Sequence, residues 1–246
     1  MARLLSEILG NITSTGIVLL SQGTPESAIL CSMLQPTLTR AFEAIISDIK
    51  EKRVSERQAE RMSISYKSAL DTINGNLESF TKLNSDLFSQ ESGFESKVYD
   101  ILEDILINSK NDVENKKAEF YGCFFGNIVF SDKCNYRQIF VIQKLVPQLT
   151  YSHLCLMKLI HERSILKARN WRKHSDDVNA ILVYHEIKEL IQFDILTKMP
   201  PFIVGEELGN LKLSSLGEAI YTLLRLEQIQ ENDLKDSRDI LKRMCQ

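Results

Sequence analysis

The chain has 246 residues, of which 43% are apolar and 26% charged, and its formal net charge is −3. This composition excludes a disordered or fibrous protein, and the length allows one large domain or two modest ones with a real core. Only 10 glycines and 5 prolines are present, which favours helices over a turn-rich β architecture. The interspersed charges of both signs exclude a bulk electrostatic attraction to nucleic acid, although they allow a local basic patch.

The five cysteines form no CxxC pair, and no histidine stands at zinc-ligand spacing from them. An odd number of thiols placed in or beside apolar stretches is typical of a protein from a reducing cytoplasm. We therefore expect a cytoplasmic chain with no metal and no cofactor. The apolar residues near the N-terminus are interrupted by polar ones, and no run reaches the ~18 residues of a membrane span.

In chain order, residues 2–10 and 26–35 are predicted to form short helices, and Pro36 is placed to begin the next helix. Ser55 and Gln58 have the spacing of a capping box. The helix after them carries a seam of apolar residues at four- and three-residue steps, with one polar member: Tyr66, Leu70, Ile73, Leu77, Phe80, Asn84 and Leu87. This seam predicts a long helix that packs either within one chain or as a coiled coil between two chains.

Further along, residues 94–106 are predicted to form an amphipathic helix, and Asn111 with Glu114 to cap the helix that follows it. That helix is apolar almost all round from Ala118 to Phe130, which predicts burial on most sides. Its Gly122 and Gly126 lie on one face and predict close approach of a second helix. The next predicted helix is capped by Asn135 and Gln138 and ends before Pro147.

The last third begins with a helix from Thr150, followed by a basic segment and a long helix from Ser175 to about Lys198. Two short β-capable pieces, Phe202–Val204 and Leu211–Leu213, then flank a turn, and Ser215 with Glu218 is predicted to cap a final helix. This order resembles a winged helix over about residues 148–228. The run LKLSSLGEAIYTLL is similar to the L-(S/T)-x-x-G-x-x-(I/L) pattern that closes the wing in that family.

The run NKKAEFYGCFFGNI, a second apolar helix and this module together resemble the bacterial abortive-infection alpha (Abi-alpha) proteins. That resemblance implies a bacterial chain with a role in phage defence. It transfers no catalytic residue.

One segment of the last third is rich in cations around a tryptophan: Arg163, Lys167, Arg169, Trp171, Arg172 and Lys173. These residues can contact phosphates and stack on a base, or form a solvated loop whose arginines pair with Glu162, Asp176 and Asp177. The predicted recognition helix, Val178–Lys198, carries three carboxylates, and the predicted wing carries two more. Because carboxylates repel phosphates, we favour a winged helix that docks protein over one that reads a DNA groove.

The run ARNWRKH resembles the R-N-x-x-x-H signature of HEPN ribonucleases, with Arg169 and His174 as the implied catalytic pair. In that family the two residues act on the RNA phosphate and 2′-hydroxyl, which suits a cation and a proton-transferring imidazole. The other histidines, His153, His161 and His185, show no metalloprotease spacing.

We therefore predict an all-α protein with a helical bundle over residues 1–147 and a winged-helix-like domain with a small hairpin over residues 148–246. The predicted function is that of a non-catalytic adaptor that binds a protein partner or itself through helical faces. A nucleic-acid-binding winged helix using residues 163–174, and a HEPN-type ribonuclease using Arg169 and His174, are the alternatives.

Overall fold

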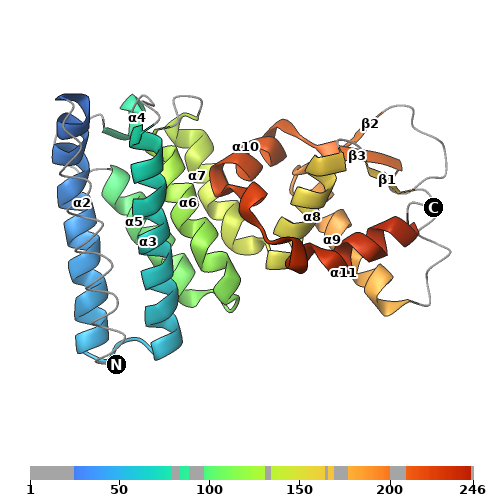
Figure 1. The fold of residues 1–246 in the computed structure, drawn as a ribbon, viewed down its shortest axis with the longest axis horizontal. Helices are drawn as coiled ribbons and strands as arrows, with labels where there is room; N and C mark the ends of the chain where they lie inside the picture. Colours follow the sequence, from blue (N-terminus) through green and yellow to red (C-terminus); the bar gives the residue numbers. More distant parts are fainter. Residues whose placement is uncertain are drawn as a thin grey trace. The chain divides into compact units, whose positions relative to one another are not determined.

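The computed structural model describes seven ranges of the chain: residues 25–78, 84–88, 97–130, 134–163, 166–168, 177–199 and 209–244. The chain is mostly helical, as its composition predicts (Figure 1). It divides into two compact units, unit 1 (Met1–Pro147) and unit 2 (Gln148–Gln246). Within the described residues, no helix has the length and apolar character needed to cross a membrane.

Unit 1 is built from helices, and Figure 1 shows the two long ones, α2 and α3, side by side. Its elements are α2 (Pro25–Lys50), α3 (Glu56–Glu78), α4 (Ser85–Phe88), α5 (Lys97–Asn111), η1 (Asn115–Lys117), α6 (Ala118–Ile128) and α7 (Tyr136–Leu145), with η2 (Val146–Gln148) at its boundary. The predicted capping boxes are confirmed at Ser55, where the backbone N–H donates to Gln58 Oε1 at 2.9 Å, and at Asn135.

Helix α6 forms the core of unit 1, and its predicted burial is confirmed. Phe124 and Phe125 are fully enclosed. A Cβ atom added to Gly122 would lie 2.6 Å from Ser68 Cβ, and one added to Gly126 would lie 2.5 Å from Thr72 Cβ. Real Cβ atoms do not approach other atoms so closely, so the two glycines allow α6 to lie directly against α3.

The predicted helix over residues 26–35 and the seam differ from the structure in their bounds, and the predicted helix over residues 2–10 lies outside the described residues. Helix α2 runs through Pro36 without ending there, because the neighbouring Leu34 and Leu38 are buried and their packing offsets the lost backbone hydrogen bond. Asn84 lies between α3 and α4 and belongs to neither helix, so the seam is not one helix. Its residues Tyr66, Leu70 and Ile73 are buried inside unit 1, as the single-chain alternative predicts. Phe80 lies outside the described residues.

Asn84 and Asn111 have roles other than those predicted. Asn84 is not a polar position of a coiled-coil seam: its buried amide donates to Cys134 O at 2.9 Å and holds the turn before α4. Asn111 does not cap a helix but ends α5. The neighbouring Asp112 accepts the Glu114 N–H instead, at 2.9 Å.

Unit 2 combines helices with a small antiparallel sheet. Its elements are α8 (Tyr151–Arg163), β1 (Leu166–Ala168), α9 (Val178–Gln192), β2 (Leu196–Met199), β3 (Gly209–Leu213), α10 (Ser215–Leu224), η4 (Leu226–Gln228) and α11 (Glu231–Met244). The strand order is β1-β3-β2. In the register, Leu211 of β3 is opposite Leu166 of β1, and Leu213 is opposite Leu196 of β2.

Three predictions for unit 2 are corrected by the structure. The long helix ends at Gln192, because Asp194 takes a left-handed conformation (φ 57°) and the chain turns into β2. The sheet contains a third strand, β1, inside the segment predicted to be a basic loop. The long helix begins after the N-cap Asp177 rather than at Ser175, and the N-cap of α10 is Ser214 rather than Ser215. Residues 169–176 and the predicted strand Phe202–Val204 lie outside the described residues.

Candidate functional site

The predicted basic site is described only at its beginning. Arg163 ends α8 and is partly exposed, and Lys167 lies in β1 with its backbone opposite Asn210. Arg169, Trp171, Arg172, Lys173 and His174 lie outside the described residues, and so does the HEPN-like motif.

Two carboxylates predicted to neutralise this segment have cationic partners in other helices. Asp177 Oδ1 accepts the backbone N–H of Asn179 at 3.0 Å, and its Oδ2 lies 2.9 Å from Arg243 Nη1. Glu162 lies 3.4 Å from Arg238 Nη2. These contacts connect α8 and α9 to α11, so the acidic residues stabilise unit 2 itself.

Helix α9 has two unlike faces. One face is buried and packs into unit 2 through Ala180, Val183, Tyr184, Ile187 and Leu190. The other exposes two large apolar side chains one helical turn apart, with Val178 68% and Leu182 55% exposed. Exposed apolar neighbours on an otherwise packed helix are a feature of docking surfaces.

Acidic residues continue this exposed face. Glu186 follows Leu182 by one turn, and Glu189 lies three residues further on. The single lysine of the helix, Lys188, places its ammonium over the Tyr184 ring, 4.6 Å from the centroid. We call Val178, Leu182, Glu186 and Glu189 the α9 stripe. It combines apolar contact area with negative charge.

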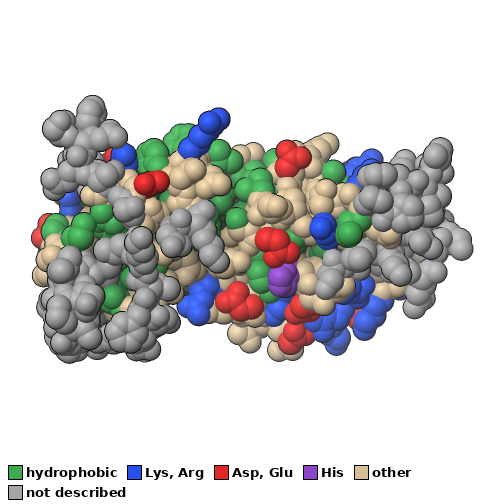
Figure 2. Space-filling model, turned by 90° about the horizontal axis from the view of Figure 1, so that it is seen from above, with side chains coloured by type: hydrophobic (Ala, Val, Ile, Leu, Met, Phe, Trp, Pro, Cys, Tyr) green, Lys and Arg blue, Asp and Glu red, His purple; other side chains and the backbone are tan. Residues whose placement is uncertain are grey.

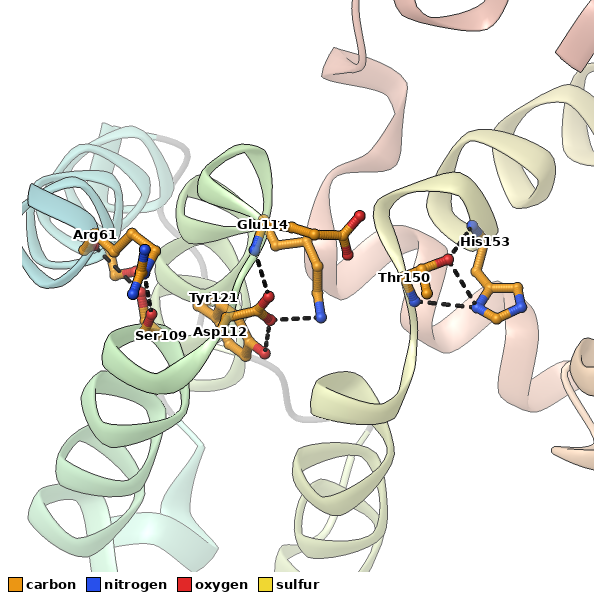
Figure 3. A network of polar contacts seen from close by, with 9 residues as sticks. Arg61, Ser109, Asp112, Glu114, Tyr121, Thr150 and His153 are labelled. Atoms are coloured by element: carbon orange, nitrogen blue, oxygen red, sulfur yellow. Dashed lines mark hydrogen bonds and ion pairs between the residues drawn. The ribbon is translucent and has the colours of Figure 1, made fainter. Parts of the chain in front are cut away.

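Helix α8 holds both carboxylates of the α9 stripe. The Ser152 hydroxyl donates to Glu186 Oε2 at 2.9 Å, and His153 Nε2 lies 3.1 Å from Glu189 Oε2. His153 is buried, and its Nδ1 accepts the Thr150 backbone N–H at 3.0 Å (Figure 3). Since Nδ1 is an acceptor, the proton of the neutral ring is on Nε2. Polar contacts from α8 therefore hold the two carboxylates of the α9 stripe in position.

A second group in unit 2 contains an exposed imidazole. The His161 ring stacks on Tyr221 with 3.9 Å between centroids, and its Nδ1 lies 3.2 Å from Glu218 Oε2. Burial raises the pKa of Tyr221, and the nearby carboxylates of Glu227, Glu162 and Glu218 raise it further. A carboxylate that orients a histidine is part of a catalytic set, yet among the described residues no hydroxyl or thiol bonds to His161 to complete one.

Unit 1 contains a buried ionic network at the turn between α5 and α6 (Figure 3). Asp112 Oδ2 lies 2.6 Å from Lys117 Nζ and accepts the Tyr121 hydroxyl at 2.8 Å. Burial acts to raise the pKa of Asp112, but hydrogen bonds from Lys117, the Glu114 N–H and Tyr121 outweigh it and hold that pKa below its usual value. Every charge of this network has a partner, which indicates a structural role.

Beside this network, Arg61 of α3 caps the C-terminal end of α5. Its Nε donates to Ser109 O at 3.1 Å and its Nη2 to Lys110 O at 2.7 Å. A helix leaves its last carbonyl groups without partners, and this buried guanidinium satisfies two of them. Neither network was predicted from the sequence. The feature that could have indicated the ionic network was a charged residue, Lys117, directly before a mostly apolar helix.

Charge elsewhere on the surface is mixed. On the face drawn in Figure 2, side chains of both signs are visible, and Lys or Arg side chains gather beside Asp or Glu side chains near one end. Over the described part of the chain, no cluster of three or more His, Cys, Asp or Glu residues has the geometry to hold a metal ion.

Comparison with known proteins returned no match to any family model, curated protein or solved structure.

Proposed function

We propose that the protein is a non-catalytic interaction protein in which unit 2, as a winged-helix-like module, binds a protein partner through the α9 stripe. The observation that carries the proposal is the exposure of Val178 and Leu182 beside the acidic Glu186 and Glu189. Each large apolar side chain contributes ~1.5–3 kcal/mol when it is fully transferred from water into an interface.

The order of elements supports the winged-helix part of the proposal. A helix, a short strand, a second helix and two antiparallel strands follow each other as α8, β1, α9, β2 and β3, and the strand order is β1-β3-β2. In a winged helix, the helix directly before the β-hairpin is the recognition helix that faces the partner. In this chain that helix is α9.

The charge of α9 favours protein over nucleic acid as the partner. A helix that enters a DNA groove presents cations to the phosphates. The α9 stripe instead presents two carboxylates, and its helix contains one lysine, which is held over Tyr184. Apolar contacts surrounded by charge are typical of protein–protein interfaces.

The test compares Leu182→Asp with Ile107→Asp, a matched control in which an apolar residue of unit 1 is 47% exposed on a helix. Tagged wild-type chain and both variants are used to capture proteins from cells that naturally contain the chain. A partner that the wild type and Ile107→Asp retain and Leu182→Asp loses is the expected result. Equal capture by all three chains, or no capture at all, contradicts the proposal.

The same preparation tests the two alternatives. A salt-dependent mobility shift with DNA or RNA that disappears when Arg169, Arg172 and Lys173 become glutamate would instead assign a nucleic-acid-binding function. RNA cleavage that His174→Ala abolishes would assign the HEPN-type function. We expect neither, because the α9 stripe is acidic and two cationic residues of α11, Arg238 and Arg243, pair with carboxylates.

We extend the proposal to phage defence in bacteria, and this extension rests on the resemblance to the abortive-infection alpha proteins. The test is the plating efficiency of phages on bacteria with and without the chain. Reduced plating that depends on Leu182 is the expected result, and equal plating on both strains contradicts the extension.

A further inference from the structure

A second helix face with exposed apolar side chains lies in unit 1, on α7. The inward side of this helix buries Ile139 and Ile142. Its outward side exposes Tyr136 at 37% and Phe140 at 48%. Lys144 follows one turn later, with its ammonium 5.3 Å from the centroid of the Phe140 ring. We call Tyr136, Phe140 and Lys144 the α7 stripe.

The charge of the α7 stripe is opposite to that of the α9 stripe. No aspartate or glutamate occurs between Lys133 and His161, so α7 is purely cationic in a chain whose net charge is −3. Lys97 adds a further ammonium, 5.3 Å from the centroid of the Tyr136 ring. The α7 stripe is therefore apolar and basic, whereas the α9 stripe is apolar and acidic.

The two stripes also match in spacing. Along α7 the residues at four-residue steps are Tyr136, Phe140 and Lys144, and along α9 they are Val178, Leu182 and Glu186. In each stripe the first two residues are apolar and the third is charged, and the two charges have opposite signs. Four residues rise ~6 Å in a helix, so a parallel pairing places both apolar pairs and the ion pair in contact at once.

From this match we infer that the protein associates with a second copy of itself, with α7 of one copy packed parallel to α9 of the other. The inference deepens the proposed function and rests on it, because it names a second copy as a partner of the α9 stripe.

Other pairings of these helices are less favourable. An in-register α7–α7 contact places Lys144 beside the same residue of the other copy, and an α9–α9 contact does the same for Glu186, which costs energy through like-charge repulsion. An antiparallel α7–α9 contact places Lys144 over Val178 and Glu186 over Tyr136, so both charges are buried without a partner. The parallel α7–α9 pairing avoids both penalties.

The contact joins two different surfaces, so each copy keeps one unused stripe after pairing. Such a heterologous contact produces a ring or an open chain. Three side chains on each helix cover much less than the ~800 Å² per partner of a stable interface. We therefore expect weak association that grows with protein concentration.

The experiment measures sedimentation velocity of the full chain from micromolar to near-millimolar concentration. The first variant, Phe140→Glu with Lys144→Glu, makes the α7 stripe acidic. The second, Leu182→Lys with Glu186→Lys, makes the α9 stripe basic. The matched control, Arg57→Glu with Lys67→Glu, reverses two exposed charges of α3.

The wild type and the control are expected to associate equally, and each stripe variant alone to associate about tenfold more weakly. An equimolar mixture of the two variants is expected to associate again, because the unchanged α9 stripe of the first variant can bind the unchanged α7 stripe of the second. The acidic α7 stripe can also bind the basic α9 stripe. Circular dichroism verifies that each variant is folded. If the second variant does not fold, Leu182→Lys alone replaces it, since Leu182 is 55% exposed.

A wild-type chain that stays monomeric at every concentration would overturn the inference. Two folded variants that each associate like the wild type, or a mixture that stays monomeric, would also overturn it. Cosedimentation of the wild type with phosphatidylserine vesicles, lost in the first variant while the protein stays monomeric, would assign the α7 stripe to a membrane instead.

These outcomes are separable from those of the proposed function. Leu182-dependent capture of another protein by a monomeric wild type would leave the proposed function intact and remove only the self-association. If self-association occurs but is unaffected by the α9 variant, and Leu182→Asp captures the same proteins as the wild type, both proposals fail.

Discussion

Helices α6 and α9 are both rich in apolar residues, yet the protein uses them in opposite ways. In α6 nearly every side chain is buried, and two glycines allow α3 to approach to backbone distance. In α9 only one face is buried, and Val178 and Leu182 remain in water. The difference indicates that α6 organises the fold of unit 1, whereas the outer face of α9 contributes little to folding and is available for binding.

The largest expected effect is on the α3–α6 contact. We expect Gly122→Val to lower the free energy of unfolding by ~3 kcal/mol or more, because the new side chain meets the α3 backbone and the helices must separate. Urea unfolding followed by circular dichroism measures the loss. Gly75→Ala is the matched control, since a Cβ there has no atom within 4 Å, and it should add ~0.5–1 kcal/mol. A fully stable Gly122→Val chain would show that this contact is not essential.

The buried ionic network comes next. Lys117→Met leaves the Asp112 carboxylate buried without its cation, and we expect a loss of ~3–5 kcal/mol in the free energy of unfolding. Lys116→Met is the control, because the neighbouring Lys116 is exposed. Equal stability of the two variants in urea would indicate that water reaches Asp112 and replaces the ammonium.

The pH dependence of stability follows from the same carboxylate. The pKa of Asp112 is lowered in the folded chain, so the unfolded chain binds its proton more tightly. The stabilisation is therefore complete above the unfolded pKa of ~3.9 and is lost as the pH falls through the folded value. Asp112→Asn should flatten the decline of the unfolding free energy below about pH 4. An unchanged decline would assign the acid sensitivity to other carboxylates.

The smallest expected effect is at the exposed face of α9. Leu182→Asp should change the free energy of unfolding by no more than ~0.5 kcal/mol, as is usual for surface positions. Leu190→Asp on the buried face of the same helix should prevent folding, because it places a charge in the core. Thermal unfolding of both variants makes the comparison. A large loss in Leu182→Asp would mean that this face already packs inside the protein.

Much of the fold follows from local pattern. The mostly apolar run of α6 predicts its burial, and the spacing of Gly122 and Gly126 predicts close helix packing. Ser55 and Asn135 form their predicted capping boxes. These features depend on residues within one or two helical turns. Helix period, backbone sterics and short-range hydrogen bonds therefore suffice to predict them.

The strands were harder to predict, because they depend on partners far along the chain. Leu196–Met199 continues an apolar helical pattern, and only its pairing with Gly209–Leu213 makes it a strand. Likewise, nothing near Leu166 indicates a third strand without knowledge of β3. Most of the predicted cationic site lies outside the described residues. The α9 stripe could not be separated from the core by sequence, because exposure depends on the whole packing of unit 2.

By itself, the sequence determined the helical character of the chain, the central place of α6 and the caps that begin several helices, because these arise from interactions between near neighbours. Tertiary structure alone decided which apolar side chains stay in water, which carboxylates are paired and where helix gives way to strand. Those outcomes depend on contacts between residues many positions apart, such as Ser152 with Glu186, Arg61 with Ser109 and Leu196 with Leu213.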